Sequence, residues 1–123
     1  GYKLCCRGNY LMTDLVQIDT TYTKRAVFED GFGNPGSITS ESAEVVYLAT
    51  GVRTVIAVTV AIEEHDTGEY SMSFLVSDAL FDVNKDYFLI LSGITVGQAT
   101  PYELGSFPFR PVKEPVTYSV DFS

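Results

Sequence analysis

The densest cluster of ionisable side chains in this sequence is Glu63-Glu64-His65-Asp66. Carboxylate and imidazole groups can hold a metal ion or act as general acids and bases. Consecutive residues of a strand point to opposite faces, however, so these side chains cannot converge unless the backbone turns sharply. We interpret the cluster as solvated loop residues, and we predict neither a metal site nor a catalytic site there.

Residues 82–86, with the sequence D-V-N-K-D, resemble the opening of a calcium-binding loop, in which alternate oxygens point inward. An EF-hand also needs glycine at its sixth position and glutamate at its twelfth, where this sequence has Tyr87 and Gly93. Lys85 would add a cation inside such a loop. The favoured interpretation is an ordinary turn ahead of a strand, so we predict no bound metal and no cofactor.

Nucleophilic catalysis would have to use His65, the only histidine of the chain, and no G-x-S-x-G elbow surrounds a serine. The two cysteines, Cys5 and Cys6, are adjacent in sequence. Neighbouring cysteines rarely bridge each other, because the small ring strains the peptide bond between them. We therefore predict a protein that is not an enzyme and that has no disulfide.

Acidic residues outnumber basic ones by 16 to 8, which gives a net charge of −8 at pH 7. Such a field repels polyphosphates and anionic headgroups, so neither nucleic acid nor a membrane is an expected partner. The apolar runs are far shorter than the roughly 20 residues of a membrane-spanning helix, and no signal-peptide pattern opens the chain. The sequence does not determine the location of the protein, although it favours a virion or the cytoplasm.

Beyond residue 11 the sequence consists of short β-favouring runs separated by turn residues, the pattern of a sandwich or barrel. Residues 1–11 are interpreted either as a foreign leader or as an N-terminal strand, and residues 12–123 as one domain. Thr50-Gly51 favours a tight hairpin, and only Ser77–Val83 could form a helical turn. The predicted strands are Leu15–Thr20, Thr23–Glu29, Ala43–Ala49, Thr54–Glu63, Glu69–Val76, Tyr87–Ser92 and Val116–Phe122, with a weaker one at Leu104–Phe109.

Alternation within two of these strands identifies the centre of the predicted core, because side chains at every second position share one face of a strand. Each buried side chain of this kind contributes about 1.5–3 kcal/mol, and Phe74→Ala should be among the costliest changes, at about 3–5 kcal/mol. The core-facing residues on this pattern are Val58, Val60 and Ile62 in one strand and Tyr70, Met72, Phe74 and Val76 in the other.

Prolines interrupt the sequence from residue 100 onward, at Pro101, Pro108, Pro111 and Pro115. Because proline cannot donate to the hydrogen-bonded ladder, we predict that this segment lies along a sheet edge or across the surface. The last run is predicted either to close the domain's own sandwich or to act as an arm that completes a neighbour's sheet. Its apolar residues share one face and form a candidate assembly face: Val116, Tyr118, Val120 and Phe122.

Residues 65–72, H-D-T-G-E-Y-S-M, resemble the D-x-G-x-Y-x-C signature of immunoglobulin-type domains, with Asp66, Gly68 and Tyr70 at the matching positions. The resemblance implies an all-β, immunoglobulin-like antiparallel sandwich of about seven to eight strands. It also implies a tyrosine corner, in which the tyrosine hydroxyl bonds to the backbone just upstream. Met72 replaces the cysteine and the chain has no tryptophan, so packing alone must join the two sheets.

The order of loops and strands is also similar to that of immunoglobulin-like modules in tailed-phage virions and bacterial surface proteins. This resemblance favours a non-catalytic structural or assembly protein that binds a second copy or a neighbouring virion subunit. If the last strand is an arm, the protein would be a homo-oligomer. The alternative is a carbohydrate- or protein-binding module that uses loops such as Asp30–Gly36 and Asp78–Asp86.

Overall fold

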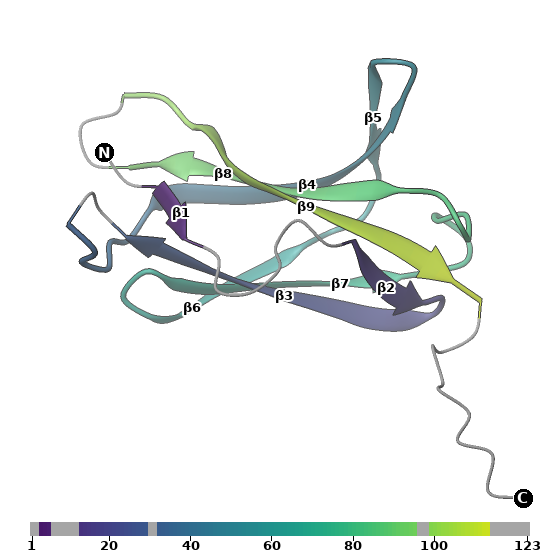
Figure 1. Cartoon of the computed structure of the whole chain (residues 1–123), viewed down its shortest axis with the longest axis horizontal. Helices are drawn as coiled ribbons and strands as arrows, with labels where there is room; N and C mark the ends of the chain where they lie inside the picture. Colours follow the sequence, from purple (N-terminus) through teal and green to yellow (C-terminus); the bar gives the residue numbers. More distant parts are fainter. Residues whose placement is uncertain (1–2, 6–12, 30–31, 96–98, 114–123) are drawn as a thin grey trace, which may run out of the picture.

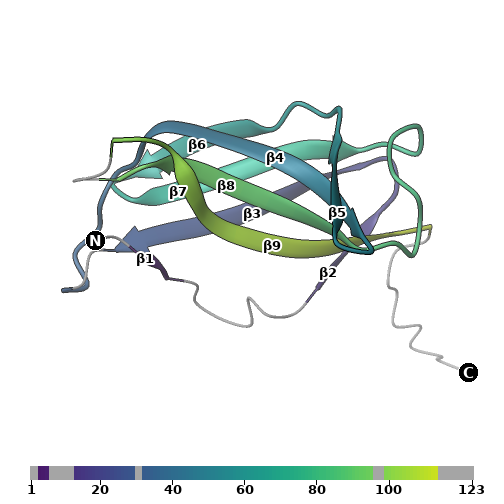
Figure 2. The same ribbon diagram turned by 90° about the horizontal axis from the view of Figure 1, so that it is seen from above.

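The computed structural model describes residues 3–5, 13–29, 32–95 and 99–113, and the regular structure in these ranges is β-strand. Two sheets pack face to face as the layers of a sandwich (Figure 1, and Figure 2 from above). No helix in the described ranges is long and apolar enough to cross a membrane. In chain order the strands are β1 (Lys3–Cys5), β2 (Asp14–Gln17), β3 (Thr20–Glu29), β4 (Thr39–Ala49), β5 (Val52–Ile56), β6 (Ala61–Asp66), β7 (Glu69–Val76), β8 (Tyr87–Ile94) and β9 (Tyr102–Val112).

Sheet A has the strand order β1-β3-β7-β6, and sheet B has the order β2-β9-β8-β4-β5. This arrangement confirms the predicted all-β sandwich. Neighbouring strands are antiparallel except for β2 and β9, which run parallel. Strand β2 does not pair with β3 because the turn between them crosses from one sheet to the other. The Ile18 N–H donates to the Val112 oxygen of sheet B at 2.8 Å, whereas the Asp19 N–H donates to the Val76 oxygen of sheet A at 2.7 Å.

The prediction of one continuous strand at Thr54–Glu63 was wrong, because the chain changes sheets within it. Strand β5 belongs to sheet B and β6 to sheet A. The break is a tight turn in which the Val58 N–H donates to the Ile56 oxygen at 2.8 Å. Val58 and Val60 still pack against the core between the two sheets, so the predicted inward face is correct even though the strand is interrupted.

The proline-containing segment, predicted to lie along a sheet edge or across the surface, forms β9, which stands between β8 and β2 in the order of sheet B. Except at Phe109 it is paired on one side only, so the expected free side is present although β9 is not the last strand of the sheet. Its register explains why prolines are tolerated there. Along β9, Phe109 is the last residue that pairs with β8 and the first residue that pairs with β2. Pro108 therefore pairs only with β8, and Pro111 pairs only with β2, while the Asn84 N–H donates to the Pro111 oxygen at 2.8 Å. Each proline lacks a strand on one side, so a missing N–H need not break a ladder.

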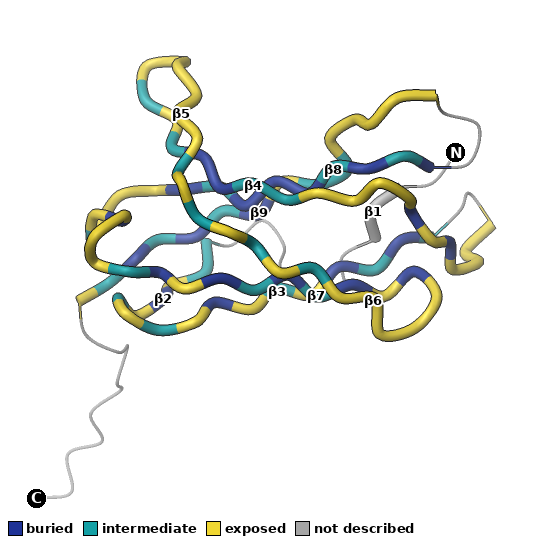
Figure 3. The backbone as a smooth tube through the Cα atoms, turned by 180° about the vertical axis from the view of Figure 1, so that it is seen from behind, coloured by how far each residue is buried: buried dark blue, intermediate teal, exposed yellow. Residues whose placement is uncertain are grey.

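The sandwich core is built around aromatic rings. Phe74 of β7 makes ring contacts with Tyr22, Phe81 and Phe109, with ring centres 5.4 to 6.0 Å apart. Phe81 is positioned by one hydrogen-bonded turn, in which its N–H donates to the Ser77 oxygen at 3.0 Å. Figure 3 shows buried and exposed positions alternating along the strands. The predicted core face of β7 is confirmed, since its residues are all buried: Tyr70, Met72, Phe74 and Val76.

The two ends of the chain are described only in part. Strand β1, within residues 1–11, pairs antiparallel with β3, where Leu4 stands opposite Phe28. The predicted strand Val116–Phe122 lies outside the described residues, and so does the candidate assembly face on it: Val116, Tyr118, Val120 and Phe122.

Candidate functional site

The D-x-G-x-Y motif forms the turn of the β6–β7 hairpin. Asp66 Oδ1 accepts a hydrogen bond from the Thr67 N–H at 2.8 Å. Gly68 has a φ of +78°, and a Cβ at this position would lie 2.7 Å from the Phe28 carbonyl oxygen. The backbone conformation and the close approach both require glycine. Gly68 is thus needed for packing between β3 and the hairpin.

Tyr70 is buried, and its hydroxyl accepts a hydrogen bond from the Ile38 N–H at 2.8 Å. The resemblance implies a partner just upstream of the motif, whereas Ile38 precedes β4, 32 residues away in sequence. Beside it, the Ser37 hydroxyl donates to Glu64 Oε2 at 2.6 Å and lowers the pKa of that carboxyl. Burial raises the pKa of the Tyr70 hydroxyl. We call Ser37, Ile38, Glu64 and Tyr70 the clamp, because they tie the start of β4 to the β6–β7 hairpin.

The ionisable cluster at residues 63–66 lies in β6, an edge strand, although a loop was predicted. It continues the ladder with β7, which a loop would not do. The side chains diverge as strand alternation requires: Glu64 contacts Ser37, whereas His65 Nε2 lies 2.7 Å from Ser71 Oγ. In the part of the chain that the structure describes, no group of three or more His, Cys, Asp or Glu residues is arranged to hold a metal ion.

Residues 82–86 form a turn whose carboxylates are directed at basic groups. Asp82 Oδ2 lies 2.9 Å from Lys85 Nζ, and Asp86 accepts two hydrogen bonds from Arg110, at 2.7 and 3.2 Å. Asn84 has a φ of +64°. This geometry agrees with the interpretation as an ordinary turn ahead of β8.

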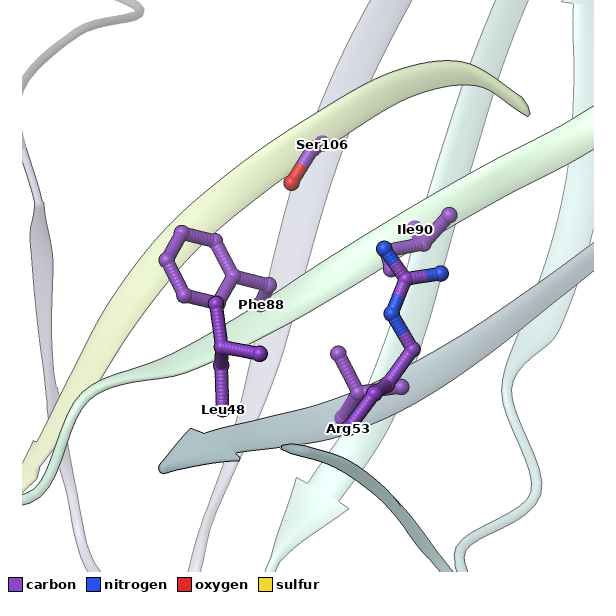
Figure 4. Close-up of a pocket in the computed structure, with 6 residues that line it drawn as sticks. Leu48, Arg53, Phe88, Ile90 and Ser106 are labelled. Atoms are coloured by element: carbon purple, nitrogen blue, oxygen red, sulfur yellow. The ribbon is translucent and has the colours of Figure 1, made fainter. Parts of the chain in front are cut away.

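The outer face of sheet B, which is turned away from the core, is the strongest candidate for a functional surface. A shallow depression of about 100 Å³ lies there between β4, β5, β8 and β9 (Figure 4). Side chains from all four strands surround it. We call this depression the outer groove, and it is lined by Val46, Leu48, Arg53, Phe88, Ile90 and Ser106.

Strand register brings the apolar side chains of this face together. Val46 stands opposite Val55 on β5 and opposite Phe88 on β8. Phe88 in turn stands opposite Pro108 on β9. Because residues directly opposite in antiparallel strands share a face, an apolar row crosses sheet B from its β5 edge to β9.

Arg53 extends over this apolar face. It forms an ion pair with Glu103 of β9, although β4 and β8 lie between their two strands. The Glu103 carboxylate raises the pKa of the Arg53 guanidinium. Figure 4 shows the guanidinium beside Ile90, which is buried together with Val46 even though both face away from the core. An arginine stem can cover apolar surface while its charged end stays in water.

The β4–β5 hairpin rises from this face beyond the body of the sandwich (Figures 1 and 3). Its turn is Thr50-Gly51, as predicted, with φ values of +49° and +77°. Leu48, Val52 and Val55 on the hairpin are 48%, 63% and 58% exposed. Leu48 and Val55 share the outer face of the hairpin, whereas Val52, opposite Ala49, lies on its other face. Exposed apolar side chains that adjoin an apolar row mark an interaction surface.

The outer face of sheet A has a different composition. Of the large apolar residues that are exposed in the described ranges, sheet A contributes only Leu75. The other outward residues of β7 are Glu69, Ser71 and Ser73, and those opposite them on β3 include Arg25 and Thr23. The apolar surface is therefore a property of sheet B.

The outer groove was not predicted from the sequence, although a signal for it exists. Val45-Val46 and Leu89-Ile90-Leu91 are apolar at consecutive positions instead of alternating. Such runs indicate strands with apolar surroundings on both faces. These runs do not specify the strand order of the sheet. Strand order decides which residues of β5 and β9 join that second face.

Comparison with known proteins supports the fold alone. No family model matches the sequence, and no curated protein matches it. Among solved structures, the chain is similar to the Lin-41 filamin domain, with a TM-score of 0.56 and 14% sequence identity over 92% of this chain and 93% of that one. The protein described here is thus an immunoglobulin-like β-sandwich.

Proposed function

We propose that this chain is a non-catalytic assembly domain that binds other protein subunits through the outer groove and the β4–β5 hairpin. The observation that supports the proposal is the apolar row across the outer face of sheet B, which continues onto the exposed Leu48 and Val55. Interface cores are typically apolar with arginine enriched, and Arg53 crosses this surface.

The shape of the outer groove favours a protein over a small molecule. Its volume of about 100 Å³ is below the roughly 300 to 1,000 Å³ of ordinary small-molecule pockets. A depression of this size fits one side chain of a partner, while the flat apolar row around it fits a wider surface. The net charge of −8 supports a protein partner over nucleic acid.

We further propose that the chain is a subunit of a phage particle or of a related particle. This proposal is supported by the similarity of the loop and strand order to virion modules. In that setting the alternating residues of the last run, Val116, Tyr118, Val120 and Phe122, would supply a second assembly face.

Site-specific photo-crosslinking tests the proposal with a matched pair of positions. Leu48 and Leu75 are 48% and 51% exposed on the outer faces of different sheets. A benzophenone amino acid is placed at either position in the full chain, expressed in its cell of origin. We expect a covalent protein adduct from position 48 and none from position 75. Equal labelling at both positions, or no adduct at 48, would overturn the proposal.

A second candidate function is ligand binding by the loops, and it is favoured by Phe32, which is 93% exposed beside residues 30–31. The loops that follow β3 and β7 lie at opposite ends of the sandwich, because these strands pair antiparallel. They cannot form one joint site. Binding of glycans to the intact chain and its loss in Phe32→Ala would support this function.

A further inference from the structure

Strand β5 is an edge of sheet B with backbone groups directed away from the sheet. The two-residue turn after Ala49 makes Ala49 and Val52 a hydrogen-bonded pair. Hydrogen-bonded and non-bonded pairs then alternate along an antiparallel ladder. Arg53 and Val55 therefore direct their N–H and C=O groups outward, whereas the intervening Thr54 bonds to β4.

This edge lacks the features that usually prevent sheets from joining. Natural edge strands are protected by lysine, proline, inward charges or bulges. Strand β5 is V-R-T-V-I, its register with β4 is unbroken, and Val52 to Val55 are all exposed. Its single charge, Arg53, is paired with Glu103 of the same chain. The strand is thus open to pairing along its outer side.

The distribution of charge favours approach of a second copy at this edge. Two chains of net charge −8 repel each other over most of their surfaces. Residues 45–62 form the longest stretch of the sequence without Asp or Glu, and they include all of β5. The absence of acidic residues from β5 lowers the repulsion when two copies meet along this strand.

We propose that β5 pairs antiparallel with β5 of a second copy, about a two-fold axis at Thr54, and so joins two five-stranded sheets into one. This inference deepens the proposed function, because it names a second copy as a partner of sheet B. An isologous contact of this kind closes after two chains and gives a dimer.

Side-chain chemistry selects the register. One alignment places Arg53 opposite the second copy's Arg53, which like-charge repulsion disfavours. Another places Val55 opposite the second copy's Val55, but it requires pairing at Ala57, in the turn where β5 ends. The remaining alignment places Arg53 of each copy opposite Val55 of the other copy. All residues of β5, from Val52 to Ile56, then take part in the pairing.

The favoured register contains no like-charge pair, and its other pairs are compatible. Thr54 meets the second copy's Thr54 on the axis, and threonine pairs are favourable across strands. Val52 meets the second copy's Ile56, an apolar pair that occurs twice by symmetry. The outer faces of the two copies then adjoin along the hairpin, so the exposed Val55 of each chain gains a neighbour.

Charged substitutions at Thr54 test the inference, with analytical ultracentrifugation as the measurement. We expect the wild-type chain to sediment as a dimer at high micromolar concentration. Thr54→Lys and Thr54→Asp each place like charges on the axis, so each variant should fall to the 13.5 kDa of one chain. An equimolar mixture of the two should recover the dimer, because Lys then faces Asp. Recovery on mixing also shows that neither variant has lost its fold.

Matched variants at Thr21, an exposed position of β3 in sheet A, serve as controls. Thr21→Lys and Thr21→Asp change the net charge equally and should leave the dimer intact. A monomeric wild type, dimeric Thr54 variants, or no recovery on mixing would overturn β5 pairing. The crosslinking pair at Leu48 and Leu75 tests the proposed function separately, since an adduct with a different protein supports that function even if β5 does not pair.

Discussion

The β6–β7 and β4–β5 hairpins turn on the same two residue types, Thr67-Gly68 and Thr50-Gly51, yet they have opposite surroundings. The glycines have nearly equal φ values, +78° and +77°. A Cβ at Gly68 would meet the Phe28 carbonyl oxygen at 2.7 Å, whereas nothing lies within 4 Å of one at Gly51. The first hairpin is enclosed by the fold, and the second is open to solvent.

The difference shows that the residue types of a turn do not determine the role of its hairpin. In β7 every second side chain enters the core, and the clamp holds the hairpin to the start of β4. In β5 four of five residues are exposed. The enclosed hairpin should therefore control stability, and the open one should control association.

The largest expected effect is at Phe74, in the core-facing row of β7. Phe74→Ala removes a ring that packs against Tyr22, Phe81 and Phe109, and it should lower the free energy of unfolding by about 3–5 kcal/mol. Val55→Ala in the open hairpin should change it by less than about 0.5 kcal/mol. Urea denaturation of both variants measures the difference. Similar losses for the two would remove the distinction between the hairpins.

Substitution of the two turn glycines makes the comparison directly. Gly68→Ala should cost about 3 kcal/mol, because left-handed strain adds to a backbone clash. Gly51→Ala should cost only about 1 kcal/mol, since the strain is present without the clash. Thermal unfolding of each variant gives the values. A loss at Gly51 as large as that at Gly68 would contradict the prediction.

Tyr70→Phe tests the clamp alone. The change leaves the Ile38 N–H without its partner in a buried place, which should cost about 1–3 kcal/mol. Tyr47→Phe in β4 is the matched control, because in the described ranges the Tyr47 hydroxyl has no such backbone partner; its effect should stay below about 0.5 kcal/mol. Chemical denaturation at neutral pH measures both. An unchanged midpoint for Tyr70→Phe would show that the clamp does not contribute to stability.

The effect that is smallest at its onset, and grows with pH, is a loss of stability at alkaline pH. Burial, with Asp14 as an additional cause, raises the pKa of Tyr22, and burial raises the pKa of Tyr70. Both hydroxyls keep their protons in the folded chain while the unfolded chain ionises near pH 10. Stability should thus be full below that pH and fall above it, by up to about 1.4 kcal/mol per pH unit for each group.

The slope of the unfolding free energy against pH measures this effect. Tyr22→Phe should make the slope shallower, whatever its effect at neutral pH. A wild-type slope that does not change in the variant would show that ionisation of Tyr22 is not linked to folding.

Much of the fold follows from short-range patterns. Alternation in β7 predicts its buried face, and Thr50-Gly51 predicts the open hairpin, because strand period and turn conformation are local properties. The candidate site depends on longer-range order. The outer groove unites residues of β4, β5, β8 and β9, and no local pattern states that β8 lies between β4 and β9.

The amino-acid sequence by itself determined the β class, the inward row of β7 and the hairpin turn at Thr50-Gly51, since each depends on a few adjacent residues. Tertiary structure decided which sheet each strand joins, as the split at Ala57 and the inner position of β9 show. It also decided which Thr-Gly turn is enclosed and which is open. The physical reason is that burial depends on what packs against a residue, and those partners lie far away in the chain.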